Sequence, residues 1–218
     1  VDLVGGDTVS SSSGLILSVS VIGRVSKKKI TYRAGAKEND LVVVTGDLGS
    51  SYLGLQILER ERGVFMENPS IQPKLEGYDE LIKKQIQPVA RQDIIDLFEE
   101  LDIVPSAMID ISDGLASEAL HLAKSSDCSI SLYSEKLPIT EKLILTAQEL
   151  NLDPYMCAMN GGEDYELLFT IGQKDYDKIK NHPSFSVIGF VTDKSQKSML
   201  IDKNNSAVQI SAQGWKHF

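Results

Sequence analysis

The chain has 218 residues, 42% of them hydrophobic and 24% charged, and no low-complexity run interrupts it. A chain of this length can bury one sizeable core or two small ones, so we expect a soluble globular protein. The formal charge of −9 and the pI near 4.9 argue against non-specific binding to nucleic acid or to an anionic membrane surface, and an anionic substrate would need cations to bridge it.

The sequence also carries information about location. No apolar run approaches the roughly 20 residues of a membrane helix, and we expect no signal peptide. Cys128 and Cys157 are too few for a disulfide framework or a zinc site, so a reducing compartment, and hence the cytoplasm, is expected. Because Val1 is not a methionine and a glycine-rich motif follows almost at once, we interpret the chain as part of a longer protein.

The first predicted feature is the Gly-Gly-Asp-Thr motif at 5–8, which offers close backbone approach to a ligand, one carboxylate and one hydroxyl. A simple turn is the alternative. Apolar residues then alternate over 15–22, which is the period of a half-buried strand. Around residues 23–29 the composition becomes basic and polar, so we place a domain boundary there, between 1–24 and 25–218.

The next stretch, Arg-Ala-Gly-Ala-Lys at 33–37, places two cations beside a glycine, which can hold a phosphate; a solvated basic loop is the alternative. The β-branched run at 41–45 predicts a strand buried on both faces, and the glycine-containing turn after it leads into a helix. Two more helices are predicted over 78–85 and 93–101.

The rest of the chain is organised around Asp-Ile-Ser-Asp-Gly at 110–114, which lies between an apolar run of strand length and a helical pattern over 115–126. Asp110 and Asp113 on a strand-to-helix turn offer oxygen ligands for a hard cation, beside backbone N–H groups that can bind phosphate. The alternative is that Asp113 only caps the helix and Asp110 is a solvated strand end.

After this motif we expect a strand over 129–133 and a helix that runs from about residue 140 to 150 and is broken at Asp153-Pro154. Glu163, Asp164 and Glu166 then precede an apolar strand, where carboxylates are costly unless they are solvated, paired or used. A strand at 186–191 and a hairpin around residues 204–205 follow. Because strands and helices alternate irregularly, the predicted fold class is α+β, a mixed β-sheet flanked by helices.

Four motifs stand in the order found in thiamine-monophosphate kinase, and the chain therefore resembles that family along its length. They are the stretches at 5–8, 33–37, 110–115 and 162–167. The first and third motifs occur in variants across the superfamily of aminoimidazole ribonucleotide synthetase. The Gly-Glu-Asp-Tyr-Glu-Leu stretch at 162–167 and the Gly-aromatic-x-His-Phe ending are more specific to the kinase.

The resemblance implies that residues 1–24 are the last strand and the phosphate and metal loop of a truncated amino-terminal ATP-binding domain. Residues 25–218 would be a carboxy-terminal α+β domain resembling that of aminoimidazole ribonucleotide synthetase-like proteins. The family phosphorylates thiamine monophosphate to the diphosphate with ATP and several Mg²⁺ ions, by direct in-line transfer. It forms homodimers, and no nucleic acid or membrane partner is expected.

The resemblance also assigns roles to single residues. Metal ligands would be Asp7, Asp110 and Asp113; nucleotide contacts would be Gly6, Asp7, Arg33 and Ser112; substrate contacts would be Glu163 and Trp215, the latter as an aromatic wall. No side chain is expected to act as a catalytic nucleophile, because phosphoryl transfer needs mainly positioning and charge neutralisation.

Two alternatives remain at this level. One is a superfamily relative with a different acceptor, such as a selenophosphate or aminoimidazole ribonucleotide synthetase-like enzyme. The other is a non-catalytic binding domain whose acidic loops are only solvated. The 218 residues taken alone are expected to lack kinase activity.

Overall fold

A computed structural model of the chain describes residues 2–212. The chain consists of two units, Val1–Ile30 and Thr31–Phe218. The described residues of the first unit form no helix or strand, and the apolar side chains at 15–22 are exposed. The strand predicted over 15–22 is therefore not formed in this chain. An extended segment needs a neighbouring strand to complete its backbone hydrogen bonds, and this unit offers none.

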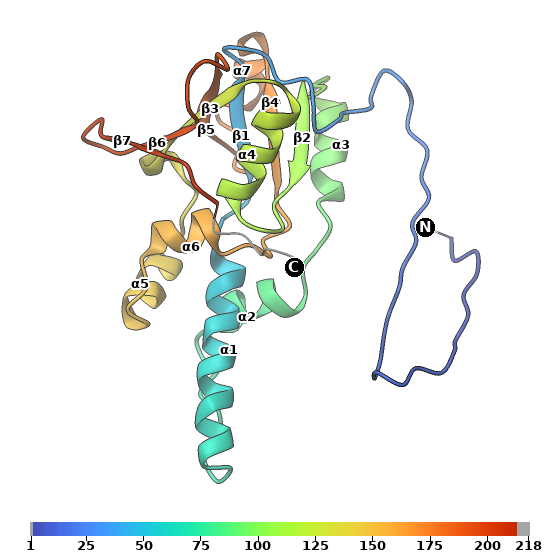
Figure 1. The fold of residues 1–218 in the computed structure, drawn as a ribbon, viewed down its shortest axis with the longest axis vertical. Helices are drawn as coiled ribbons and strands as arrows, with labels where there is room; N and C mark the ends of the chain where they lie inside the picture. The colour runs from blue at the N-terminus through green and yellow to red at the C-terminus, as the bar shows by residue number, and fades with distance from the viewer. Residues whose placement is uncertain (1, 213–218) are drawn as a thin grey trace. The chain divides into compact units, whose positions relative to one another are not determined.

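The second unit is built on a seven-stranded mixed sheet with the order β2-β4-β1-β5-β3-β6-β7 (Figure 1). Neighbouring strands are antiparallel except for β3 and β6, which are parallel. The predicted hairpin is confirmed as β6 and β7. The strands are β1 Leu41–Thr45, β2 Ala107–Asp110, β3 Ser129–Tyr133, β4 Leu167–Ile171, β5 Phe185–Thr192, β6 Met199–Ile201 and β7 Ala207–Gln209.

Helices cover the two faces of this sheet and also form a layer of their own. The α-helices are α1 Ser50–Glu67, α2 Asp79–Ile86, α3 Gln92–Glu100, α4 Leu115–Ser125, α5 Glu141–Glu149, α6 Pro154–Asn160 and α7 Tyr176–Ile179; single 3₁₀ turns occur at Ser134–Lys136 and Gln173–Asp175.

The strand β1 is an inner strand of the sheet, and its β-branched residues are buried on both faces. Val42, Val43 and Val44 are fully buried, and their backbones pair with β4 on one side and β5 on the other. On one face, α4 packs Leu115 and Leu122 into the largest apolar cluster. The buried central strand that the β-branched run predicts is therefore confirmed.

The opposite face of the sheet is covered by α3 and α7. The ring of Phe98 lies edge-on to Phe169, with ring centroids 5.0 Å apart, and stacks on Phe185 at 5.9 Å. Such aromatic pairs stabilise a core beyond the area that they bury. The central strands of the sheet are therefore enclosed on both faces, as their apolar residues require.

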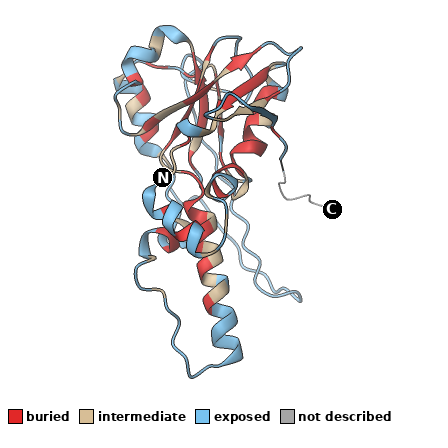
Figure 2. Ribbon diagram, turned by 90° about the vertical axis from the view of Figure 1, so that its left-hand side faces the viewer, coloured by how far each residue is buried: buried red, intermediate tan, exposed pale blue. Residues whose placement is uncertain are grey.

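A third cluster joins α1, α2, α5 and α6 into a helical layer, with Leu53 and Ile57 of α1 packed against Leu81 and Leu143. Figure 2 shows that the buried part of α1 is the part nearest the sheet, whereas its distal end is exposed. The first half of α1 is thus the part that packs against the other helices of this layer.

The helix predicted from about residue 140 to 150 is α5, and it ends before Asp153-Pro154 as predicted. The same two residues also start α6: the Asp153 carboxylate accepts the Met156 N–H at 2.9 Å, and Pro154 occupies the first turn. Proline suits that position because the first N–H groups of a helix have no partner within it. The segment 30–32 forms no strand, although the carbonyl of Tyr32 accepts the N–H of Met108 at 2.9 Å.

The predicted fold class, an α+β protein with a mixed sheet flanked by helices, is confirmed. Within the described part of the chain, no helix has both the length and the apolar character needed to cross a membrane.

Candidate functional site

The motif at 110–114 forms a strand-to-helix turn, as its sequence predicts. The strand β2 ends at Asp110 and α4 begins at Leu115. Asp110 and Asp113 are exposed and Ser112 is half-buried. The N-cap of α4 is Gly114, and no side chain caps the helix. The alternative that Asp113 serves only as a helix cap is therefore wrong, and both carboxylates face solvent at the end of the sheet.

The acidic loop at 162–166 is joined to this turn by backbone hydrogen bonds. The N–H of Glu163 donates to the carbonyl of Ser112 at 2.7 Å, and the N–H of Tyr165 donates to that of Ile111 at 2.9 Å. In return, the N–H of Ile111 donates to the carbonyl of Glu166 at 2.8 Å. The two motifs, about 50 residues apart in the sequence, thus form one structural unit.

The close approach of the two loops depends on unusual backbone conformations. Gly162 has φ of 71°, and a Cβ at this position would lie 2.6 Å from the carbonyl oxygen of Ser112. Glu163 and Tyr165 also have positive φ, at 60° and 51°. A bulky residue in this region of φ is strained, and such strain persists only where the surrounding structure imposes it. The acidic loop is therefore held in one conformation by its neighbours.

Asp164 has a structural role. It is buried, and both of its carboxylate oxygens lie 3.0 Å from the N–H of Gly49, which immediately precedes α1. Burial raises the pKa of Asp164 to about 7. The carboxylate at this position satisfies a backbone donor at the start of α1 and is not available to a ligand.

Glu166 is also used by the fold. It is 3% exposed and accepts hydrogen bonds from the hydroxyl of Thr45 at 2.6 Å, from Lys84 Nζ at 3.1 Å and from the guanidinium of Arg91. These partners come from β1, α2 and the loop before α3. A buried carboxylate with three donors is compensated, so Glu166 fixes the acidic loop to the rest of the fold.

Glu163 differs from its two acidic neighbours because its side chain is exposed. The described contact of its carboxylate is the hydroxyl of Tyr165, which donates to Oε2 at 3.2 Å. Burial, followed by the Glu163 charge, raises the pKa of Tyr165. Of the three carboxylates, two are paired within the fold, and Glu163 is the one that a ligand can reach.

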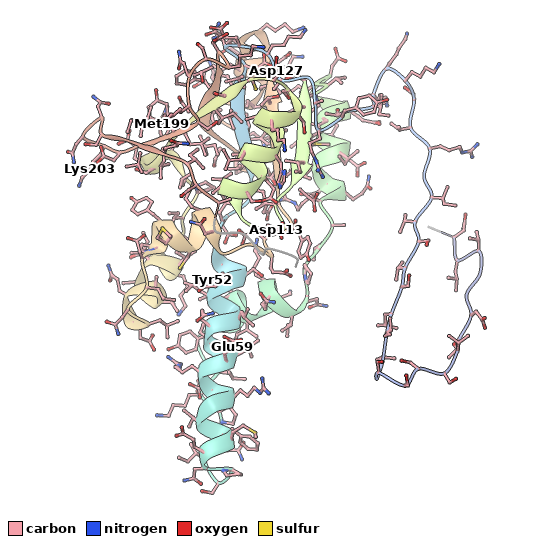
Figure 3. All side chains as sticks on the ribbon, in the orientation of Figure 1. Tyr52, Glu59, Asp113, Asp127, Met199 and Lys203 are labelled. Carbon is pink, nitrogen blue, oxygen red and sulfur yellow. The ribbon has the colours of Figure 1, made fainter. Side chains whose placement is uncertain are left out.

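A hollow of about 640 Å³ brings three of the predicted site residues together. Ser112, Asp113 and Glu163 line it, with Tyr52 of α1 and Asn160 of α6 on its walls. Tyr52 and Asp113 are both labelled in Figure 3, which shows Asp113 below the lower end of α4. The hollow thus lies where the sheet, the helical layer and the two acidic loops meet, and its polar groups suit a phosphorylated ligand with bound cations.

A second hollow of similar volume lies beside Asp47, Lys84, Arg91 and Glu166. Several of its charged groups pair with one another: Lys84 Nζ lies 2.9 Å from Asp47, and Arg91 lies 2.8 Å from Asp93. We assign the candidate site to the first hollow, because that hollow is lined by the predicted residues Ser112, Asp113 and Glu163.

Glu118 is a residue of the site that the sequence reading missed. It lies in the first turn of α4 and is 2% exposed. Its Oε1 accepts the N–H of Asp113 at 3.3 Å, whereas Oε2 is buried without a hydrogen-bond partner among the described residues. Burial raises the pKa of Glu118 to about 7. The signal in the sequence is a carboxylate on the apolar stripe that Leu115, Ala119 and Leu122 define.

The structure does not bring Arg33 to this hollow. The segment that follows it is bound to Ser126, whose hydroxyl accepts the N–H groups of Gly35 and Ala36 at 3.1 Å each. Ser126 is the C-cap of α4, and Asp113 precedes the start of that helix. The neighbouring Asp127 and Asp113 lie at opposite ends of α4 in Figure 3. The nucleotide contact expected of Arg33 therefore needs a phosphate at the other end of this helix and stays a prediction.

The remaining predicted residues are Gly6, Asp7 and Trp215. The first two lie in the unit of residues 1–30, where the side chain of Asp7 accepts the N–H of Thr8 at 2.8 Å. Trp215 lies outside the described residues. Their assigned roles stay predictions.

The donor set at the turn fits Mg²⁺. No group of three or more His, Cys, Asp and Glu side chains is arranged to hold a metal by itself within residues 2–212. Mg²⁺ typically binds one or two carboxylates together with water and substrate phosphates, so the exposed pair Asp110 and Asp113 suffices. The unpartnered oxygen of Glu118 beside them is a further sign that this region lacks positive charge.

The fold agrees with that of a solved structure of Escherichia coli HypE, a hydrogenase maturation protein. The TM-score is 0.59 at 16% identity, over 84% of this chain and 52% of that one. The fold thus places the chain among proteins with the aminoimidazole ribonucleotide synthetase-like fold.

Comparison of sequences narrows this class. Thiamine-monophosphate kinase from Buchnera aphidicola subsp. Schizaphis graminum is 34% identical over 223 residues, which cover all of this chain and 64% of the relative. A structure named "AaThiL complexed with AMPPCP and TMP" has a TM-score of 0.67 and 32% identity, over 86% of this chain and 54% of that one. The resemblance carried by the four motifs is thereby confirmed: along its whole length the chain is related to the thiamine-monophosphate kinases.

No protein-family model matches the chain. The chain spans less than two thirds of the length of the curated relative cited above.

Proposed function

We propose that this chain is part of a thiamine-monophosphate kinase, which transfers the terminal phosphoryl group of ATP to thiamine monophosphate and forms thiamine diphosphate. The observation that carries the proposal is that backbone hydrogen bonds join the turn at 110–114 to the acidic loop at 162–166. In this arrangement Asp110, Asp113 and Glu163 remain exposed at one edge of the sheet. Relatedness to the kinases over the whole chain supports it.

In this proposal Asp110 and Asp113 hold Mg²⁺, and the bound cation neutralises the phosphates of both substrates. Ser112, between the two carboxylates, contacts the nucleotide. Gly6, Asp7 and Arg33 contribute further nucleotide contacts, with Asp7 also on Mg²⁺. The chain is acidic overall, so without such cations its carboxylates repel both phosphorylated substrates.

Glu163 and Trp215 are assigned to the acceptor. Thiamine carries a cationic thiazolium ring, which a carboxylate can pair with and an indole can stack on; stacking of a cation on indole contributes about 0.5–2 kcal/mol. The fixed backbone of Glu163 and the hydrogen bond from Tyr165 restrict where its carboxylate can lie. A carboxylate held in this way can orient the acceptor.

Direct in-line transfer suits these residues. The reaction needs the acceptor phosphate and the terminal phosphate of ATP to be aligned, and it needs no covalent intermediate on the protein. Cys157, the thiol on the wall of the hollow, is buried, and burial raises its pKa to about 11, so it is unsuited to act as a nucleophile.

The test is phosphoryl transfer from ATP by the natural protein that carries this chain, with a panel of acceptors. Thiamine monophosphate should turn over, and unrelated monophosphates should not. If another acceptor of the superfamily turns over and thiamine monophosphate does not, the acceptor assignment is wrong. If the protein binds neither ADP nor Mg²⁺ in calorimetry, it is a non-catalytic domain.

We also propose that the 218 residues alone do not turn over, because they correspond to only part of the related kinases. Asp110 and Asp113 hold the cations from one side, and repulsion between two phosphorylated substrates is then poorly compensated. Parallel assays of this chain and of the natural protein test this; equal turnover would contradict it. For the natural protein we expect a cytoplasmic homodimer, which sedimentation analysis and cell fractionation test.

A further inference from the structure

We propose that Glu118 is a positioning residue of the cation site: it holds Asp113 through the backbone and places a third, buried negative charge behind the two accessible carboxylates. This inference rests on the cation site of the proposed function, to which it adds a residue that the motif reading did not include. Glu118 need not touch the ion.

The first argument is the burial of Glu118 without a partner for one oxygen. The side chain is 2% exposed, and Oε2 has no hydrogen-bond partner within the described residues. An ionised carboxylate in such a place is strongly destabilising unless positive charge compensates it. The fold therefore retains a costly group that its own packing does not require.

The second argument is the absence of a counter-charge on the elements that pack against α4. The elements that pack most extensively against α4 are β2, β3, β4 and α6, and none of these four carries a lysine or an arginine. The Asp113 and Asp110 charges act on Glu118 and have the same sign as Glu118 itself. On α4, Lys124 lies in the last turn, six residues away. Compensating charge has to come from outside these elements.

The third argument is the direct link between Glu118 and Asp113. Oε1 accepts the N–H of Asp113 at 3.3 Å, so the carboxylate fixes the backbone from which the Asp113 side chain projects. Its place in the first turn of α4 also sets it near the positive end of the helix dipole. Groups behind metal ligands act in this way, by orienting the ligand and adding charge.

A positioning role and a merely structural role predict different results for Glu118→Gln. The amide keeps an oxygen acceptor for the Asp113 N–H but removes the charge. If Glu118 serves the cation, the variant should bind divalent cations about 10- to 100-fold more weakly. Its unfolding midpoint without divalent cations should equal or exceed that of the wild type. A merely structural role predicts a lower midpoint and an unchanged cation affinity.

The experiment is a titration of the 218-residue chain with Mn²⁺, followed by electron paramagnetic resonance, together with urea unfolding with and without Mn²⁺. Glu141→Gln is the matched control, because Glu141 also lies in the first turn of a helix but is exposed. The control should bind Mn²⁺ as the wild type does. Glu118→Gln should bind it more weakly and lose most of the rise in unfolding midpoint that Mn²⁺ causes.

Two results would overturn the inference: wild-type affinity for Mn²⁺ in Glu118→Gln, or no binding of Mn²⁺ by the wild type. Neither result depends on the acceptor. If affinity falls as expected but thiamine monophosphate is not phosphorylated by the natural protein, the acceptor assignment fails and the role of Glu118 stands.

Discussion

Glu166→Ala should destabilise the chain strongly, because this carboxylate joins three parts of the fold. The substitution removes the acceptor of the Thr45 hydroxyl, which is completely buried, and one partner each of Lys84 and Arg91. Thr45 also accepts the N–H of Leu167, so its hydroxyl is tied to the strand that follows the acidic loop.

The loss in free energy of unfolding depends on which former partners of Glu166 are left without another hydrogen-bond or ion-pair partner. Lys84 retains Asp47 and Arg91 retains Asp93, whereas the hydroxyl of Thr45 retains no acceptor among its described contacts. Breaking a buried ion pair by removing one member costs about 3–5 kcal/mol, and the retained partners favour the lower half of this range. Glu166→Gln keeps an acceptor for Thr45 and should cost about half as much.

Urea unfolding followed by circular dichroism measures the effect, with Glu163→Ala as the control. Glu163 is exposed, so its truncation should change the free energy of unfolding by no more than about 0.5 kcal/mol. A loss below about 1 kcal/mol in Glu166→Ala would refute the reasoning, since it would mean that the buried network contributes no more than an exposed pair.

Three further predictions concern the same two loops. Burial raises the pKa of Asp164 to about 7 from an ordinary value of 3.8. The protonated form is therefore favoured in the folded state, and the free energy of unfolding should fall by about 4 kcal/mol as the pH rises from about 4 through about 7. The urea midpoint should fall less over this range in Asp164→Asn, and parallel curves for the two proteins would contradict the assignment. Asp110→Asn in the natural protein should lower turnover by orders of magnitude, in a way that depends on Mg²⁺ concentration; near-normal turnover at limiting Mg²⁺ would restore Asp110 as a solvated strand end. Tyr165→Phe should raise the apparent KM for thiamine monophosphate about three- to tenfold, with little change in that for ATP, because it removes the donor to Glu163; the matched control Tyr155→Phe should leave both constants unchanged.

Much of the fold can be predicted from the sequence, since local pattern and burial agree there. Three local patterns predict the element that forms: the β-branched run predicts β1, the apolar stripe predicts α4, and the turn at 204–205 predicts the hairpin of β6 and β7. The start of α6 was missed because Asp153-Pro154 is a breaker for the preceding helix and a favourable start for the next one. Residues 15–22 have a strand pattern, but pairing depends on a partner that a local pattern does not reveal.

The candidate site could be predicted only in part. The motifs identify Asp110, Asp113 and Glu163, and the structure brings these residues to one edge. What the sequence does not reveal is which acids of the loop are compensated. The cationic partners of Glu166 are 75 and 82 residues away in the chain, so the division of roles among the three carboxylates depends on tertiary packing.

The central claim is that Glu163 acts on the acceptor, whereas Asp164 and Glu166 hold the loop that carries it. The most direct test is the apparent KM for thiamine monophosphate in the natural protein carrying Glu163→Gln, measured at saturating ATP and Mg²⁺. We predict a rise of about tenfold or more, because a carboxylate that pairs with a cationic ring is replaced by a neutral amide, while the urea midpoint stays that of the wild type. An unchanged KM, or a rise that occurs only together with a lower urea midpoint, would contradict the account.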